Sequence, residues 1–167
     1  MNLLVIRHAI AEDRDAWARQ GKEDTRRPLT SAGRSRMRKV ARGLKVVQPE
    51  IDLLATSPLT RARQTARIIG KVYDEKVEVV DALAPDRDRQ DVLDWLLEQQ
   101  EQLTMAIVGH EPSLGLLASW LLASPLNHFI EFKKGGAALV SWDGPPEAGN
   151  GWLQWSLHPN HLRRLGV

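Results

Sequence analysis

Arg7 and His8 stand next to each other at the point where the apolar run 3–6 ends. That run, made of large aliphatic and β-branched residues, is typical of a buried strand. Burying a guanidinium or an imidazole costs free energy, so such a strand seldom ends in both unless something binds there. The pair therefore predicts a binding or catalytic site at the carboxyl end of the first strand.

Polar and charged side chains also follow three later strand-like segments. The stretch "ATSPLTRARQTA" places Ser57 in a turn and Arg61 in the first turn of a helix. The stretch "AIVGHEPSLG" places His110 and Glu111 at another helix start, and the Asp-rich stretch "DALAPDRDRQD" contains Asp86. Parallel strands bring their carboxyl ends to one edge of a sheet, so these side chains are expected to converge there.

Each of these residues taken alone has an ordinary structural explanation, as a packed histidine or a surface arginine. Arg61 is poorly placed for helix stability, because the helix dipole repels a cation at the N-terminus and stabilises an anion there. Two histidines and two arginines, without cysteine or an H-E-x-x-H motif, do not suit zinc. A glycine-rich phosphate loop and a G-x-S-x-G elbow are also missing. The chemistry that fits is a tetrahedral dianion held by the arginines and attacked by a neutral histidine.

The surrounding segments alternate between strand-like and helix-like patterns. Strands are expected at 2–7, 52–56, 76–80, 104–109, 136–142 and 152–157, and helices at 30–47, 59–73, 89–101 and 112–124. Such alternation predicts a three-layer α/β/α fold with a mostly parallel sheet flanked by helices. The last two strands, joined by the Gly/Pro-rich segment 143–151, are expected to form an antiparallel hairpin at one edge.

Two charged segments invite a functional interpretation. Segment 8–29 has no clear element, is polar, and follows the first strand at the edge where ligands of open α/β sheets bind. The helical stretch 33–45 carries six Lys or Arg and no acidic residue. This basic face is either a solvated helix surface or a docking face for an acidic partner.

The bulk composition is that of an ordinary globular protein, with 43% hydrophobic and 26% charged residues. The length of 167 residues predicts one domain, 1–167, without a cap insertion, and the net charge of +2 does not require nucleic acid as a partner. No run is long enough to span a membrane, and no signal peptide is expected, because charge follows the first apolar stretch. The sequence contains no cysteine, which excludes disulfides, and these features together favour the cytoplasm.

Three separated motifs, "IRHA", "SPLTRARQTA" and "VGHEPSLG", resemble in their order the histidine phosphatase superfamily, also called phosphoglycerate-mutase-like. The stretches "RPLTSAG" and "KKGGAALVSW" extend the resemblance over most of the chain. Short members without an inserted cap domain, particularly the SixA-type protein phosphohistidine phosphatases, are the most similar. The resemblance implies a mostly parallel sheet flanked by helices, with no metal ion and no other cofactor.

The resemblance also implies a role for each matching residue. His8 is the expected nucleophile that becomes phosphohistidine, and water then hydrolyses its phosphoryl group. Arg7 and Arg61 are expected to clamp the phosphoryl oxygens, and His110 to donate a further hydrogen bond to them. Two roles stay open for Ser57, which either contributes a hydroxyl near the phosphate or caps its turn.

Two positions depart from the family pattern. Ala9 replaces the usual glycine, so a backbone with positive φ is not expected there. Pro85 lies near the place where many members carry a glutamate as general acid, which leaves Asp86 beside it and Glu111 after the second histidine as alternative proton donors. The structural alternatives are a solvated loop acid for Asp86 and a carboxylate stabilised by a helix N-terminus for Glu111.

A poorly placed acid suits a phosphohistidine substrate, because its imidazole can leave already protonated, whereas an alkoxide needs a proton donor. The sequence therefore predicts a metal-independent phosphatase that acts on phosphohistidine in a protein and binds phosphate or sulfate in its site. Two alternatives stay open: a small-molecule phosphomonoesterase and a non-catalytic phosphate-binding regulatory module. Neither a nucleic-acid nor a membrane partner is expected, and the sequence does not specify the oligomeric state.

Overall fold

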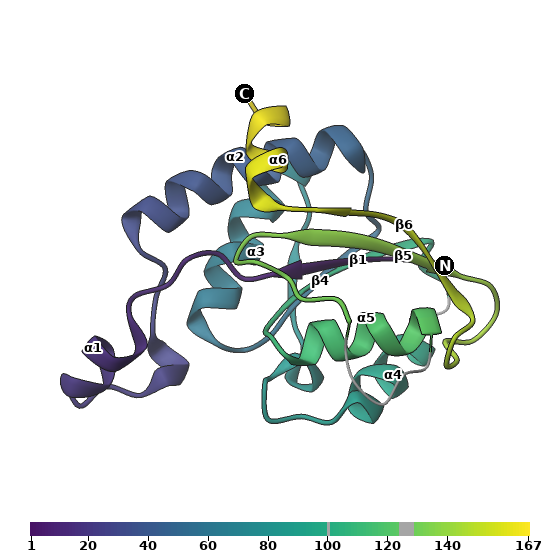
Figure 1. Ribbon diagram of the computed structural model, residues 1–167, viewed down its shortest axis with the longest axis horizontal. Coiled ribbons are helices and arrows are strands. Elements are labelled where there is room, and N and C mark those ends of the chain that lie inside the picture. The colour runs from purple at the N-terminus through teal and green to yellow at the C-terminus, as the bar shows by residue number, and fades with distance from the viewer. Residues whose placement is uncertain (100, 124–128) are drawn as a thin grey trace.

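The computed structural model describes residues 1–99, 101–123 and 129–167 and contains a six-stranded sheet (Figure 1). In the spatial order of the sheet, the strands are β3 (Val77–Val79), β2 (Leu53–Thr56), β4 (Thr104–Gly109), β1 (Asn2–Arg7), β5 (Ala137–Trp142) and β6 (Gly151–Leu157). The first four run parallel, β5 is antiparallel to β1, and β6 is antiparallel to β5. The expected mostly parallel sheet with an antiparallel hairpin at one edge is confirmed.

Helices cover both faces of this sheet (Figure 1). On one side lie α2 (Ser31–Val47), α3 (Thr60–Tyr73) and α6 (Pro159–Leu165), and on the other lie α4 (Arg89–Glu98) and α5 (Ser113–Ala123). Along β1, Leu4 and Ile6 pack into the apolar cluster beneath α2, α3 and α6, whereas Leu3 and Val5 pack into the cluster beneath α4 and α5. This period of two is that of a strand buried on both faces, and the three-layer α/β/α fold is confirmed.

The sheet order brings three strand ends together. β4 pairs with β1 on one side and with β2 on the other, and all three are parallel. Their carboxyl ends at Arg7, Gly109 and Thr56 are therefore neighbours, and the residues that follow each strand share one edge of the sheet.

All the strands and helices expected from the sequence are present, but several short helices were missed. Residues 100 and 124, at the ends of two expected helices, lie outside the described residues. The missed elements are α1 (Arg14–Arg19), the 3₁₀ turns η1 (Asp24–Arg26) and η2 (Asp81–Leu83), and α6. Helix α1 buries none of its residues, and the other three are too short to show a hydrophobic period.

Helix α2 has the amphipathic character that its sequence predicts. Thr30 Oγ1 accepts a hydrogen bond from Gly33 N (2.8 Å) and so caps the helix. Met37 and Leu44 are buried on its inner face. Its exposed basic side chains are Arg36, Arg38, Lys39 and Arg42.

Within the described part of the chain, no helix combines the length and the apolar character needed to cross a membrane.

Candidate active site

His8 follows β1 directly and is held at the edge of the sheet by its backbone N–H, which donates to Gly109 O (3.1 Å). Only 6% of the residue is exposed. Its ring Nδ1 lies 2.7 Å from Ala9 O, and because a carbonyl oxygen only accepts, Nδ1 carries the proton and Nε2 keeps its lone pair. Burial, assisted by the charges of Arg61 and Arg7, lowers the pKa of His8 to about 3. The imidazole is therefore neutral at neutral pH.

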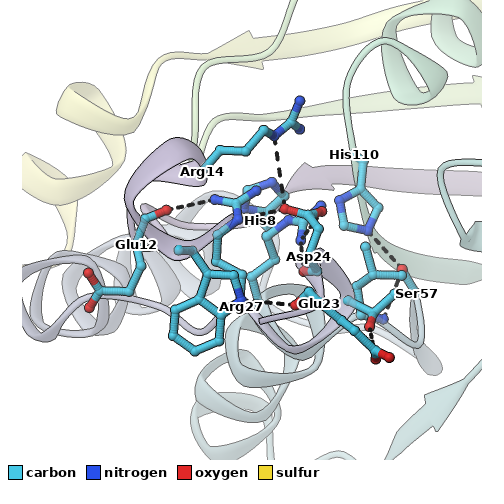
Figure 2. A network of polar contacts seen from close by, with 12 residues as sticks. His8, Glu12, Arg14, Glu23, Asp24, Arg27, Ser57 and His110 are labelled. Carbon is cyan, nitrogen blue, oxygen red and sulfur yellow. Dashed lines mark hydrogen bonds and ion pairs between the residues drawn. The ribbon is translucent and has the colours of Figure 1, made fainter. Parts of the chain in front are cut away.

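His110 follows the neighbouring strand β4, and its ring centroid lies 5.1 Å from that of His8. Its Nε2 lies 2.8 Å from Ser57 Oγ (Figure 2). Ser57 Oγ accepts a hydrogen bond from Leu59 N (3.3 Å) and still has its own proton to donate. We assign that proton to the bond with Nε2, which puts the imidazole proton on Nδ1. Burial, with a smaller contribution from His8, lowers the pKa of His110 to about 2. Nδ1 is buried and has no hydrogen-bond partner among the described residues.

A short chain of hydrogen bonds ties the end of β1 to helix α3. Ala9 N donates to Thr65 Oγ1 (3.0 Å), and the Thr65 hydroxyl donates to Arg61 O (2.8 Å). Asp74 is the one non-glycine residue with a positive φ among those described, so Ala9 has the ordinary backbone that its identity predicts. The missing glycine therefore causes no strain at this point of the backbone.

The two arginines expected to bind an anion are both restrained at one end of the guanidinium. Arg7 Nη1 donates to Phe132 O (2.6 Å). Arg61, which is 3% exposed, donates from Nη1 to Asp24 O (3.0 Å) and pairs with Asp24 Oδ2 (3.1 Å). In both arginines Nε is buried and has no hydrogen-bond partner within the described part of the chain. These two N–H groups are donors that an anion can satisfy.

Asp24 is the main residue of the site that the sequence did not single out. Its carboxylate also accepts a hydrogen bond from Arg27 Nε (2.8 Å) and lies 3.9 Å from Arg14 Nε (Figure 2). Burial alone would raise the pKa of Asp24, but the Arg27 hydrogen bond and the charge of Arg61 hold it below its usual value. Segment 8–29 thus folds back and places a carboxylate against Arg61. The Asp-x-x-Arg spacing just before Pro28 was the available signal.

The two candidate proton donors lie in different environments. Asp86 is exposed in the turn after η2. Glu111 is half-buried, and its Oε1 accepts a hydrogen bond from Phe132 N (3.3 Å), the residue whose carbonyl binds Arg7. Glu111 therefore contacts the backbone segment that restrains Arg7.

A cavity of about 160 Å³ lies beside His110, between the start of α5 and η2 with the segment that follows it. Buried apolar side chains form much of its wall, including Leu83, Val92 and Leu114. Arg87 and Asp88, which also line it, are exposed. The cavity offers space next to His110 for part of a substrate.

Among the described residues, no group of three or more His, Cys, Asp or Glu side chains is arranged to hold a metal ion. The groups gathered at this edge are cations and neutral imidazoles around one carboxylate, which is a set suited to an anion.

Comparison with known proteins identifies the family of the chain. The family model of the histidine phosphatase superfamily (branch 1) matches residues 3–85. An uncharacterised protein of Picosynechococcus is 36% identical over 139 residues, with 81% of this chain and 82% of that protein covered. The phosphohistidine phosphatase SixA of Escherichia coli is 29% identical over 167 residues, with 98% and 97% covered. A solved structure of the protein histidine phosphatase SixA complexed with tungstate superposes with a TM-score of 0.80 at 29% identity, covering 97% of this chain and 99% of that one. With His8 and His110 at neighbouring strand ends, Arg7 at the end of β1 and Arg61 at the start of α3, the chain belongs to the histidine phosphatase superfamily.

Proposed function

We propose that this protein is a phosphatase that acts on phosphohistidine in a protein and works through a covalent phosphoryl intermediate on His8. The observation that carries the proposal is the fixed tautomer of His8. Its Nδ1–H donates to Ala9 O, so Nε2 keeps a lone pair inside a site that contains two arginines. Similarity to SixA, whose name states its phosphohistidine substrate, supports the choice of substrate.

In the first step, the free N–H groups of Arg7 and Arg61 and the Nδ1–H of His110 hold the phosphoryl oxygens. Nε2 of His8 attacks phosphorus, so the P–N bond to the substrate imidazole breaks as the bond to His8 forms. The substrate imidazole leaves neutral when its other ring nitrogen already carries a proton. The charge that forms on the His8 ring is stabilised by the bond from Nδ1–H to Ala9 O.

In the second step, a water molecule attacks phosphorus and the bond to His8 Nε2 breaks. Inorganic phosphate leaves, and His8 returns to its neutral form with the proton still on Nδ1. Ser57 supports both steps indirectly, because its hydroxyl occupies His110 Nε2 and directs the His110 proton to the opposite side of the ring.

The proposal is tested by incubating the protein with a phosphohistidine peptide and, separately, with p-nitrophenyl phosphate and with a sugar phosphate. The expected result is release of phosphate from the peptide and an acid-labile phosphoryl group on His8. His8→Ala should abolish both, whereas His161→Ala, which changes an exposed histidine on α6, should not. Activity that persists in His8→Ala would overturn the covalent mechanism. Equal efficiency on sugar phosphates would instead favour a small-molecule phosphomonoesterase, and oxoanion binding without turnover would favour a non-catalytic module.

Glu111 and Asp86 are the proposed candidates for the general acid, and matched variants distinguish them. Glu111→Gln keeps an oxygen acceptor for Phe132 N but removes the proton, and Asp86→Asn does the same in the exposed turn. The variant that removes the acid should slow hydrolysis of an alkyl phosphate, whose leaving group needs a proton, more than hydrolysis of phosphohistidine. If neither variant shows this difference, the reaction has no dedicated acid.

A further inference from the structure

The turn 133–136, within the "KKGG" stretch, is attached to the backbone of the proposed nucleophile. Gly136 N donates to Lys133 O (2.7 Å), which closes the turn, and Gly135 has the positive φ of +79° that a glycine accepts readily. Gly135 N donates to Arg7 O (3.1 Å) and His8 O (3.2 Å). The backbone of Lys134 is therefore held one residue away from the end of β1.

Lys134 makes no ion pair and donates no side-chain hydrogen bond within the described part of the chain. Its neighbour Lys133 is also exposed but differs in having a partner, since its Nζ lies 3.5 Å from Glu131 Oε1. Partial burial, and then the charges of Arg7 and Arg27, lower the pKa of Lys134. The charges of the site's arginines therefore act on Lys134, which has no carboxylate partner among the described residues.

The positive charge of Lys134 also acts on His8, the proposed nucleophile. Three cations lower the pKa of His8: Arg61, Arg7 and Lys134. The first two are the proposed phosphoryl clamp. A third cation near the same imidazole raises the free energy of the empty site through mutual repulsion, and a bound dianion would reverse the sign of that contribution.

We propose that Lys134 is a third phosphoryl-binding cation, which reaches from the turn 133–136 to the oxygens held by Arg7. The inference rests on the proposed function, because it assigns Lys134 to the same anion. Lys134 supplies a mobile ammonium on a fixed backbone, whereas Arg7 and Arg61 supply planar guanidinium groups restrained by Phe132 and Asp24. It stabilises the charge that spreads over the phosphoryl oxygens during transfer.

The test uses Lys134→Met with Lys133→Met as its matched control, since both remove one ammonium from adjacent positions. Binding of inorganic phosphate and of tungstate is measured by titration calorimetry at fixed ionic strength. Lys134→Met should weaken both by about tenfold, the size expected for one charge-assisted contact. Lys133→Met should bind them as the wild type does, and Lys134→Arg should restore most of the lost affinity.

Thermal unfolding without an added anion supplies a second readout. Loss of a purely structural lysine lowers the melting temperature, whereas Lys134→Met should leave it unchanged or raise it, because repulsion among the cations is relieved. Unchanged phosphate binding in Lys134→Met, or no phosphate binding by the wild type, would overturn the role of Lys134. If Lys134→Met weakens phosphate binding but the wild type hydrolyses no phosphohistidine peptide, the proposed function fails and the assignment of Lys134 stands.

Discussion

A buried, neutral imidazole follows each of the strands β1 and β4, but the two rings differ in which ring nitrogen is free and whether that nitrogen carries a proton. His8 donates its Nδ1–H to a carbonyl, so its free Nε2 offers a lone pair. With the Ser57 hydroxyl assigned as the donor to His110 Nε2, the free Nδ1 of His110 carries an N–H. Burial keeps both rings neutral, and in the proposed reaction the hydrogen-bond partner decides which ring serves as the nucleophile and which as the donor.

The largest effect is expected from removing the lone pair at the end of β1. His8→Asn keeps an N–H that can donate to Ala9 O but has no nucleophilic nitrogen, and should lower kcat by roughly 10⁴-fold or more. The measurement is phosphate release from a phosphohistidine peptide. If His8→Asn retains more than a few per cent of the activity, the His8 lone pair is not the nucleophile.

At the end of β4, the N–H rather than the lone pair is expected to matter. His110→Ala should lower kcat by roughly 10²–10³-fold, the usual cost of losing one donor to the transition state. His110→Asn, which restores an N–H near the position of Nδ1, should recover part of that loss. The acid-labile phosphoryl group on His8 should still form in both variants, and its absence would place His110 in the nucleophilic role.

The two histidines should also make stability depend on pH. Both native pKa values, about 3 for His8 and about 2 for His110, lie below the unfolded value near 6.5, so between these limits the unfolded chain binds more protons. The two histidines should therefore make their full contribution to stability above about pH 6.5. As the pH drops below that value, the free energy of unfolding should fall by up to about 1.4 kcal/mol per pH unit for each histidine. Denaturant titrations of the wild type and His110→Asn between pH 7 and 4 should show a shallower slope for the variant. Identical slopes would contradict a neutral, buried His110.

The smallest effect is expected from the hydroxyl that orients His110. Ser57→Ala removes the partner of His110 Nε2 and should lower kcat by about tenfold, which corresponds to one neutral hydrogen bond. Ser57→Thr keeps the hydroxyl and serves as the control. Steady-state kinetics on both variants decide the point, and an effect as large as that of His110→Ala would mean that Ser57 itself binds the phosphoryl group.

The sequence predicted the convergence of the strand ends, because the apolar runs that precede His8 and His110 are long enough to be recognised as buried strands. The helix that carries Arg61 was predicted from the helical spacing of its apolar residues. Asp24 was not predicted, since its contact with Arg61 spans 37 residues and depends on how segment 8–29 folds back. The proton assignments of both rings were also beyond the sequence, because each depends on an acceptor or donor supplied by tertiary structure.

Asp24 has a consequence for the end of the catalytic cycle. A site that binds phosphate too tightly is inhibited by its own product, because turnover then waits for phosphate to dissociate. The Asp24 carboxylate lies 3.1 Å from Arg61 Nη1 and is therefore a counter-ion that the protein itself supplies. In the proposed reaction, this pairing limits the attraction that Arg61 exerts on free phosphate and so favours product release.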